Sequence, residues 1–288
     1  MAVLHEKARD IAVAYEADIC VVGGSCTGVF AAVSAARLGA RVALIERNGF
    51  FGGVATAGLV NVWHSIFDVS GQQQIVAGLT TEVLERLKRT QAVAILGHGR
   101  TLAYAVLNTE VLKMVLDDLV LEANVRPFLH TLFAAPIVSD GQLAAVVVED
   151  KTGRRAIKAS YFVDATGDGD VAERAGFECF KREQLQPPTT CAIIRGLGEC
   201  TRRNPGFVPA EAVFDPRYPS AIRPGFYWSQ PVPGSVDDTM VAGTRVFGAD
   251  CSDADQLTRA EIEGRRQVRA MCDIFRMQAG AAAVPLVA

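Results

Sequence analysis

Several features that define other classes of protein are scarce or missing in this chain. No apolar run approaches the roughly twenty residues that a membrane-spanning helix needs. Glu6, Lys7, Arg9 and Asp10 interrupt any early apolar run of the kind found in signal peptides. The net charge is only −3, from 29 basic and 32 acidic residues, so no basic excess indicates nucleic-acid binding. The sequence therefore predicts neither a membrane nor a nucleic acid as a partner.

Cysteines are present, but not in a pattern that binds metal or builds a disulfide framework. The chain has 7 cysteines, an odd number, and no two of them form a C-x-x-C pair. This pattern predicts a reducing, cytoplasmic compartment and no zinc site. Asp168 and Asp170 flank a glycine, as in part of a calcium loop, but no further spaced acids complete such a loop. We therefore expect no metal.

The chain does have ample material for a hydrophobic core. Half of its 288 residues are hydrophobic and 21% are charged, which is typical of a globular protein. This length accommodates two modest domains or one large domain with an insertion.

The stretch between Asp18 and Arg47 has the pattern of a βαβ unit. Apolar residues 19–22 predict a buried parallel strand, and helical spacing follows over residues 29–38. Gly39 ends this helix, and a second apolar run at residues 42–45 leads directly to Glu46. A unit of this kind, with a glycine-rich first turn and a terminal acid, is typical of dinucleotide-binding proteins.

The first turn of this unit carries the binding prediction. Gly23 allows a tight turn, Gly28 lets the helix pack closely, and the helix N-terminus offers N–H groups to a pyrophosphate. Ser25 replaces the middle glycine of the GxGxxG pattern, and its small side chain could donate a hydrogen bond. Glu46 is placed to accept hydrogen bonds from an adenosine ribose. The alternative is a glycine-rich turn that binds nothing.

Cys26 lies in the same turn, where two interpretations are open. A helix N-terminus could lower the pKa of its thiol and make it reactive. The tight turn favours the simpler interpretation, in which cysteine is chosen as a small residue that fits.

Residues 48–58 form a second glycine-rich stretch, in which Gly52 and Gly53 suit a backbone that wraps closely around a ligand. The alternative is a flexible connector. His64 follows this loop, so it is a candidate general base, although a lone histidine is more often a surface or core residue. Helices are expected over residues 75–89 and 108–123.

The middle of the chain predicts more strands. We expect a strand at residues 125–132 and then a hairpin whose arms are residues 143–149 and 155–163. The second arm runs into small and acidic residues, where Thr166 and Gly167 would let the backbone approach a ligand.

The composition changes after residue 176. Residues 180–240 are rich in proline, arginine and aromatic residues, which indicates long loops that cover a pocket or, alternatively, a poorly ordered insertion. Strands are expected at residues 189–196 and 239–246, and a long helix at residues 258–278. Residues 279–288 form a small-residue tail that would be weakly ordered alone.

Four spaced motifs together resemble the FAD-dependent oxidoreductases with a glutathione-reductase-like fold. They are VVGGSCTG at residues 21–28, IERNGFFGGVATAGLV at 45–60, YFVDATGDGD at 161–170 and LTRAEIEGRR at 257–266. The resemblance covers about residues 18–275. It also implies a longer chain, because such proteins usually continue with a stretch that returns to the flavin domain.

The resemblance implies FAD as cofactor and assigns its binding residues. These are the first turn, the acid, the flavin loop, a strand end near adenine, and the ATG segment: Gly23, Gly24, Ser25, Cys26, Thr27, Gly28, Glu46, Arg47, Gly52, Gly53, Ala55, Thr56, His130, Ala165, Thr166, Gly167 and Asp168. His64 is the one candidate for a catalytic base.

The expected fold class is α/β, a Rossmann-like FAD-binding domain with a parallel sheet and a β-meander, plus a sheet-containing cap or substrate region. We expect the FAD-binding domain at residues 1–175 with an insertion at about 59–107, the cap region at 176–250, and a returning helix and tail at 251–288.

The predicted function is transfer of hydride from a small organic substrate to flavin N5. Two alternatives stay open at this point. One is an NAD(P)-dependent dehydrogenase; the other is a non-catalytic or split FAD-binding subunit whose partner chain supplies the missing C-terminal part. A homo-oligomer is a further expectation that the resemblance leaves open.

Overall fold

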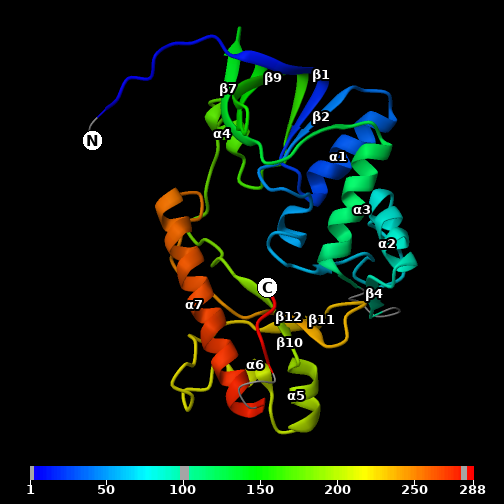
Figure 1. The fold of residues 1–288 in the computed structure, drawn as a ribbon, viewed down its shortest axis with the longest axis vertical. Coiled ribbons are helices and arrows are strands. Elements are labelled where there is room, and N and C mark those ends of the chain that lie inside the picture. Colours follow the sequence, from blue (N-terminus) through cyan, green and yellow to red (C-terminus); the bar gives the residue numbers. More distant parts are fainter. Residues whose placement is uncertain (1–2, 98–103, 280–283) are drawn as a thin grey trace. The chain divides into compact units, whose positions relative to one another are not determined.

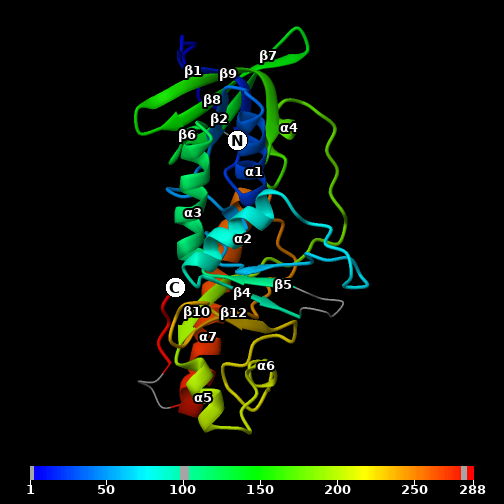
Figure 2. The ribbon, with the colours of Figure 1, turned by 90° about the vertical axis from the view of Figure 1, so that its right-hand side faces the viewer.

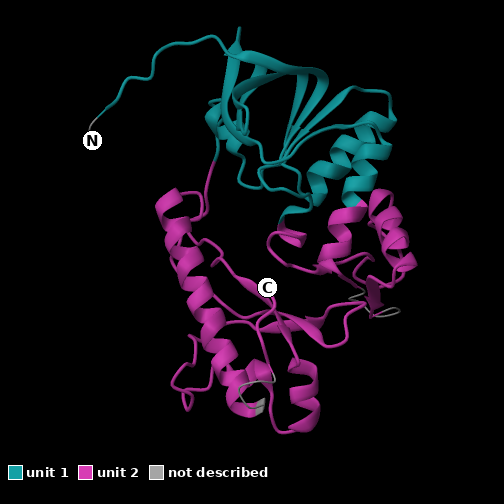
Figure 3. Cartoon of the chain, viewed as in Figure 1, with its two compact units in different colours: residues 1–53, 116–179 teal, residues 54–115, 180–288 magenta. Residues whose placement is uncertain are grey.

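The computed structural model describes residues 3–97, 104–279 and 284–288, and the chain divides into two units (Figure 3). The first unit contains residues 1–53 and 116–179, and the second contains residues 54–115 and 180–288. Each unit is a group of residues that pack together, so the bounds of the units do not test the functional boundaries expected at residues 175 and 250. Those boundaries stay predictions.

A six-stranded sheet organises the first unit, with strand order β6-β2-β1-β9-β8-β7. Its strands are β1 (Ala12–Val22), β2 (Val42–Ile45), β6 (Arg126–Phe128), β7 (Leu132–Ser139), β8 (Gln142–Asp150) and β9 (Gly153–Asp164). β1 pairs in parallel with both β2 and β9, whereas β7, β8 and β9 form an antiparallel meander, seen in Figure 2. The predicted α/β fold with a parallel sheet and a meander is confirmed.

The prediction missed one strand of this meander. We expected one strand over residues 125–132, but the structure has a short β6 and a separate β7 that pairs with β8. Pro136 lies within β7 and has no N–H to donate, so the run does not read as a strand from sequence. β7 is an edge strand, where a proline is tolerated.

Helix α1 (Cys26–Arg37) connects β1 to β2, as the βαβ pattern predicts (Figure 1). Its buried side is made of small residues, including Val29, Ala32 and Val33, which allow the helix to lie close to the sheet. Helix α3 (Thr109–Glu122) and the short helix α4 (Asp170–Arg174) complete the helices that reach the first unit.

The second unit contains two three-stranded antiparallel sheets. One has the order β3-β5-β4, with β3 at Val62–Trp63, β5 at Tyr104–Leu107 and β4 at Val93–Leu96. The other has the order β10-β12-β11, from Cys191–Arg195, Asp238–Ala242 and Trp228–Pro231. The helices of this unit are α2 (Leu79–Arg89), α5 (Leu197–Arg203), α6 (Pro209–Ala212) and α7 (Ala254–Ala279), and η1 (Gly53–Ala55) lies at its start.

Helix α7 provides the core of the second unit. Its buried residues Met271, Ile274 and Phe275 pack with Ile194 and Val241 from one face of the β10-β12-β11 sheet. Burial of a side chain such as Phe275 contributes about 2 kcal/mol to folding. None of the helices in the described part of the chain is long and apolar enough to cross a membrane.

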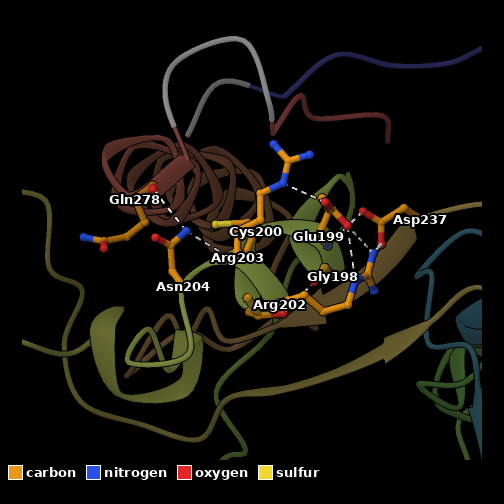
Figure 4. Close-up of polar contacts among 9 residues, drawn as sticks. Gly198, Glu199, Cys200, Arg202, Arg203, Asn204, Asp237 and Gln278 are labelled. Atoms are coloured by element: carbon orange, nitrogen blue, oxygen red, sulfur yellow. Dashed lines mark hydrogen bonds and ion pairs between the residues drawn. The ribbon is translucent and has the colours of Figure 1, made fainter.

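Helix α5 is fastened to its surroundings at both ends (Figure 4). At its start, Asp237 accepts a hydrogen bond from the Glu199 N–H at 3.1 Å, and a Cβ on Gly198 would overlap the Asp237 carboxylate. At its end, the Asn204 side chain donates to the carbonyl of Gln278 in α7 at 3.4 Å. Two exposed arginines of the same helix pair with Glu199: Arg202 and Arg203.

The tail was expected to be weakly ordered alone, and its last five residues are held by a sheet, whereas residues 280–283 lie outside the described part of the chain. Residues 284–288 extend the β10 edge of the second sheet, where Val287 donates to the Ile193 carbonyl at 2.8 Å and Ile193 donates to the Ala288 carbonyl at 2.7 Å. Val284 is fully buried in the same core as α7. Pairing with β10 holds residues 284–288 in place, which their small side chains could not do alone.

Replacing Gly264 tests the packing of α7. An exposed helical glycine is usually less stable than alanine by about 1 kcal/mol. Here, however, a Cβ would overlap Thr190 Oγ1 and lie 2.9 Å from Thr190 Cβ. We expect Gly264→Ala to lower the free energy of unfolding by about 1–3 kcal/mol in urea denaturation. Adding Thr190→Ala should restore part of the loss, and a single variant more stable than the wild type would contradict this packing.

Candidate functional site

The end of β1 meets the end of β9 at the predicted nucleotide turn. The Ala165 N–H donates to the Val22 carbonyl at 2.8 Å. Gly23 follows with φ +105°, and a Cβ there would overlap the Ala165 carbonyl. The two predicted segments, the first turn and the ATG segment, are therefore in direct backbone contact, and only glycine fits at position 23.

The start of α1 is shaped by Gly28 and Ser25. A Cβ on Gly28 would overlap the Gly23 carbonyl, so the helix lies directly against the turn. Ser25 is the N-cap, and its Oγ accepts a hydrogen bond from the Gly28 N–H at 3.2 Å. Because Oγ is used as an acceptor there, the hydroxyl proton can still donate outward. No acidic residue lies in the first turn of α1 to offset its positive end.

Glu46 is buried, with 5% of its surface exposed, and its carboxylate is held by backbone and side-chain donors. Oε2 accepts from the Gly24 N–H at 2.8 Å. Oε1 accepts from both the N–H and the side-chain amide of Asn48, each at 2.8 Å. Oε1 therefore has both lone pairs engaged by these donors, whereas Oε2 keeps one acceptor position for a further donor such as a ribose hydroxyl.

The flavin loop predicted from sequence is fixed against the nucleotide turn within the first unit. The Gly52 N–H donates to the Gly24 carbonyl at 2.8 Å, and Gly52 forms a parallel bridge with Ser25. A Cβ on Gly53 would lie 2.9 Å from the Ser25 Cβ. The loop is therefore not the flexible connector of the alternative interpretation at these two residues.

Two residues of this site were missed from the sequence. Phe51 is 2% exposed, and its ring fills the space where Gly24 would carry a Cβ. Asn48 holds Glu46. Their position in the sequence could have indicated both residues. Phe51 directly precedes the glycine pair, and Asn48 lies two residues after Glu46.

Cys26 does not have the reactive environment that one interpretation required. Its Sγ donates to the Gly52 carbonyl at 3.6 Å, and burial raises the pKa of its thiol to about 12. Desolvation outweighs the helix N-terminus here, so the neutral thiol dominates at physiological pH. The structure supports the interpretation of a small residue that fits the turn. Thr27, next in the helix, is exposed.

His130 lies beside the chain that follows Glu46. It has φ +50°, donates its N–H to the Asn48 carbonyl at 3.0 Å, and its imidazole occupies the space where Gly49 would carry a Cβ. A positive φ at a histidine is an unusual conformation that tends to occur at functional sites. A backbone contact from this residue to adenine stays a prediction.

The segment after β9 is organised by Asp164. Its Oδ1 accepts from the Thr166 N–H and hydroxyl at 3.1 and 2.7 Å, and its Oδ2 accepts from two N–H groups at the start of α4 at 3.0 Å. Gly167 has φ +96° with open space around its Cα, and Asp168 is exposed. Asp164 and Thr166 shape this loop, while Gly167 and Asp168 are left accessible.

The remaining predicted cofactor residues are Arg47, Ala55 and Thr56. Arg47 is exposed in the first unit. Ala55 and Thr56 are buried and belong to the second unit. Their contact with a cofactor stays a prediction.

His64 also belongs to the second unit, where it follows β3 and is exposed. Its ring lies 5.4 Å from the ring of Tyr104 on β5. The Tyr104 hydroxyl accepts a hydrogen bond from the Gln230 side chain at 3.3 Å. Tyr104 can therefore still donate its own proton.

The sheet, the glycine turn and the buried acid define an α/β protein with a dinucleotide-binding type of βαβ unit. Comparison with known families gives the narrower assignment. Residues 18–283 match the FAD dependent oxidoreductase family, and the chain belongs to that family. FAD is therefore its cofactor, which decides against the nicotinamide alternative.

Solved structures agree on the fold. The p-nitrophenol 4-monooxygenase of Pseudomonas putida DLL-E4 is 12% identical with a TM-score of 0.57, covering 95% of this chain and 66% of its own. A geranylgeranyl bacteriochlorophyll reductase-like protein from Thermoplasma acidophilum is 14% identical with a TM-score of 0.56, covering 95% and 65%. A myxobacterial chondrochloren halogenase, described as FAD-dependent, is 14% identical with a TM-score of 0.53, covering 95% and 61%.

At these identities the likeness shows the fold alone. The chain spans less than two thirds of the length of each of these three proteins. No curated protein sequence matches the chain.

The residues of the first unit fit FAD. The Ser25 hydroxyl and the positive end of α1 suit a pyrophosphate, and no acid of the first helical turn opposes it. The free acceptor position on Glu46 Oε2 suits a ribose hydroxyl. These residues would hold the adenosine diphosphate part of the cofactor.

Replacing Glu46 by glutamine tests this fit. The amide NH₂ would face either the Gly24 N–H or the two donors of Asn48, so at least one buried donor would lose its acceptor. We expect the free energy of unfolding to fall by about 1–3 kcal/mol and FAD to bind about tenfold or more weakly. Urea denaturation and fluorescence titration with FAD measure the two effects.

Glu16→Gln is the matched control, because Glu16 lies on β1 with its carboxylate exposed. It should leave both quantities unchanged. A Glu46→Gln variant with unchanged affinity for FAD would show that this carboxylate does not face the cofactor.

Proposed function

We propose that the protein oxidises a small organic substrate by taking hydride from a C–H bond. FAD, when bound, supplies the hydride acceptor at N5 of its isoalloxazine ring. The protein groups bind the cofactor, orient the substrate and move the accompanying proton. A cytoplasmic location and a small-molecule substrate belong to the same proposal.

One observation carries the proposal most strongly. Gly24 is the residue through which the nucleotide turn, the acid and the flavin loop are joined: its N–H donates to Glu46 and its carbonyl accepts from Gly52. The nucleotide turn, Glu46 and the flavin loop thus form a cofactor cradle that exists before the cofactor binds. Binding therefore requires little reorganisation of the protein. This cradle supports cofactor binding in the mode that the family uses for redox chemistry.

His64 and Tyr104 are the groups that we propose for proton transfer. Imidazole accepts and releases protons near neutral pH, and His64 is exposed to a ligand from solvent. The side-chain amide of Gln230 donates a hydrogen bond to the Tyr104 oxygen and so orients that hydroxyl. The hydroxyl proton of Tyr104 stays available for donation, and the Tyr104 ring lies beside the ring of His64. This pair supports the choice of His64 as the general base.

The alternative is an FAD-binding chain that acts only with a partner polypeptide or as a homo-oligomer. The match spans less than two thirds of each solved neighbour reported above, so activity of this chain alone is itself part of the test. If FAD binds but substrates reduce it only after a second polypeptide is added, this alternative replaces the first.

Anaerobic reduction tests the reaction. The 288-residue chain loaded with FAD is mixed with candidate alcohols, amines and α-hydroxy acids, and loss of the visible flavin bands is followed. We expect at least one C–H donor to bleach the bands, more slowly when that bond carries deuterium. Gly24→Ala should load with FAD at least tenfold more weakly, because a Cβ would overlap Phe51 and Glu46.

Gly206→Ala is the control, since a Cβ there has no neighbour within 4 Å. Bleaching by NADH or NADPH with none of the C–H donors would overturn the proposal, because reducing equivalents would then come from a nicotinamide and not from the substrate.

The role of His64 is tested by His64→Gln and Tyr104→Phe. If His64 removes a proton, we expect His64→Gln to slow bleaching by about 10²–10⁴-fold. Tyr104→Phe should slow the reaction less. FAD affinity should not change in either variant, and His5→Gln serves as an exposed histidine control. An unchanged bleaching rate in His64→Gln would remove His64 from the mechanism.

A further inference from the structure

A short segment of the second unit is tied to helix α7 at both of its ends. At one end, Gln267 of α7 bonds the backbone of Arg245: its Oε1 accepts from the Arg245 N–H at 2.8 Å, and its Nε2 donates to the Arg245 carbonyl at 3.1 Å. At the other end, Gln256 Oε1 accepts from the Asp250 N–H at 3.1 Å. Residues 246–249, here called the bridging segment, are therefore held beside the helix by hydrogen bonds on either side.

A cleft of about 260 Å³ lies between the bridging segment and α7. Val246 and Phe247 supply apolar surface from the segment, and Arg259 and Glu263 supply polar groups from the helix. A Cβ on Gly248, which also lines the cleft, would meet no atom within 4 Å. Ligand pockets in proteins measure about 300–1,000 Å³, so this cleft has room for one small molecule.

The cleft has an excess of unpaired positive charge. Arg259 is exposed and makes no hydrogen bond or ion pair within the described part of the chain. The guanidinium of Arg223 lies over the Phe247 ring, 4.1 Å from its centroid. Arg245 donates only to neutral oxygens, a threonine hydroxyl and a carbonyl, each at 2.6 Å. Three arginines without an acidic partner make the local potential positive and favour an anion.

The acids nearest to the cleft are already engaged. Glu263 Oε1 accepts from Gln267 Nε2 at 3.2 Å, and its Oε2 lies 3.7 Å from Arg266. Asp250, at the end of the bridging segment, pairs with Lys181 at 3.0 Å. Neither acid therefore neutralises Arg259, whose planar fork of N–H groups matches the two oxygens of a carboxylate.

We propose that this cleft binds a small organic carboxylate, with its two oxygens on Arg259 and its apolar body against Val246 and Phe247. The carboxylate belongs either to the substrate or to an effector that binds apart from the reacting groups. The first source deepens the proposed function and rests on it. Binding itself does not depend on that function.

Titration calorimetry with three probes tests the binding. The 288-residue chain is titrated with benzoate, with the uncharged isostere benzamide and with inorganic phosphate, an anion that lacks an apolar body. Each titration is run on wild type, Arg259→Gln and Arg269→Gln. Arg269 is the matched control because it is also exposed on α7 without an ion-pair partner in the described residues, but does not line the cleft.

We expect wild type and Arg269→Gln to bind benzoate at least about tenfold more tightly than either other probe. Arg259→Gln should lose this preference. The comparison of probes on wild type needs no variant, so the test survives if Arg259→Gln does not fold. Absence of benzoate binding, equal binding of benzoate and benzamide, or equal binding of benzoate and phosphate would overturn the inference. So would a preference that Arg259→Gln retains.

A second arm identifies the source of the carboxylate. Anaerobic flavin reduction by an active C–H donor is measured with and without benzoate. A higher half-saturating donor concentration at an unchanged limiting rate assigns the cleft to the substrate, whereas a changed limiting rate assigns it to an effector. Failure of every C–H donor to reduce the flavin would count against the proposed function alone, because the calorimetric arm needs no reduction.

Discussion

The backbone contact between Gly23 and Ala165 is the constraint on which the candidate site depends. It exists because β1 lies beside β9 and because position 23 carries no side chain. From this contact the other features follow in order. The turn bends away from the sheet, α1 starts against it at Gly28, and the Gly24 N–H is left pointing at Glu46. A side chain at position 23 would displace the turn, the start of α1 and the Gly24 N–H together. The site is therefore a single rigid arrangement and not a set of separate contacts.

Much of this site could be predicted from the sequence, because its elements lie close together along the chain. The strand, turn, helix, strand and acid lie within one stretch, and their spacing alone predicts the βαβ unit. What could not be predicted depends on tertiary packing. Nothing in the sequence shows that Phe51 fills the space beside Gly24, or that burial would raise the pKa of Cys26 against the effect of the helix N-terminus. The strand β7 was missed because Pro136 interrupts its pattern, although an edge position tolerates it.

The second unit was predicted less well for a related reason. Its sheets are assembled from strands of only two to five residues, which are too short to show a clear alternating pattern in the sequence. In this unit His64 is exposed beside the ring of Tyr104, whereas the amide of Asn61 is buried.

The contact between Gly23 and Ala165 has a consequence for how the protein is made. The nucleotide turn, α1 and β2 leave the ribosome early, but Ala165 follows only after residues 54–115 of the other unit have been synthesised. During that interval β1 can pair with β2, but its other edge lacks its neighbour β9 and is open to wrong pairing. The cofactor cradle takes its final shape late in synthesis. Slow translation after β2 would therefore lengthen the period in which this strand edge stays open.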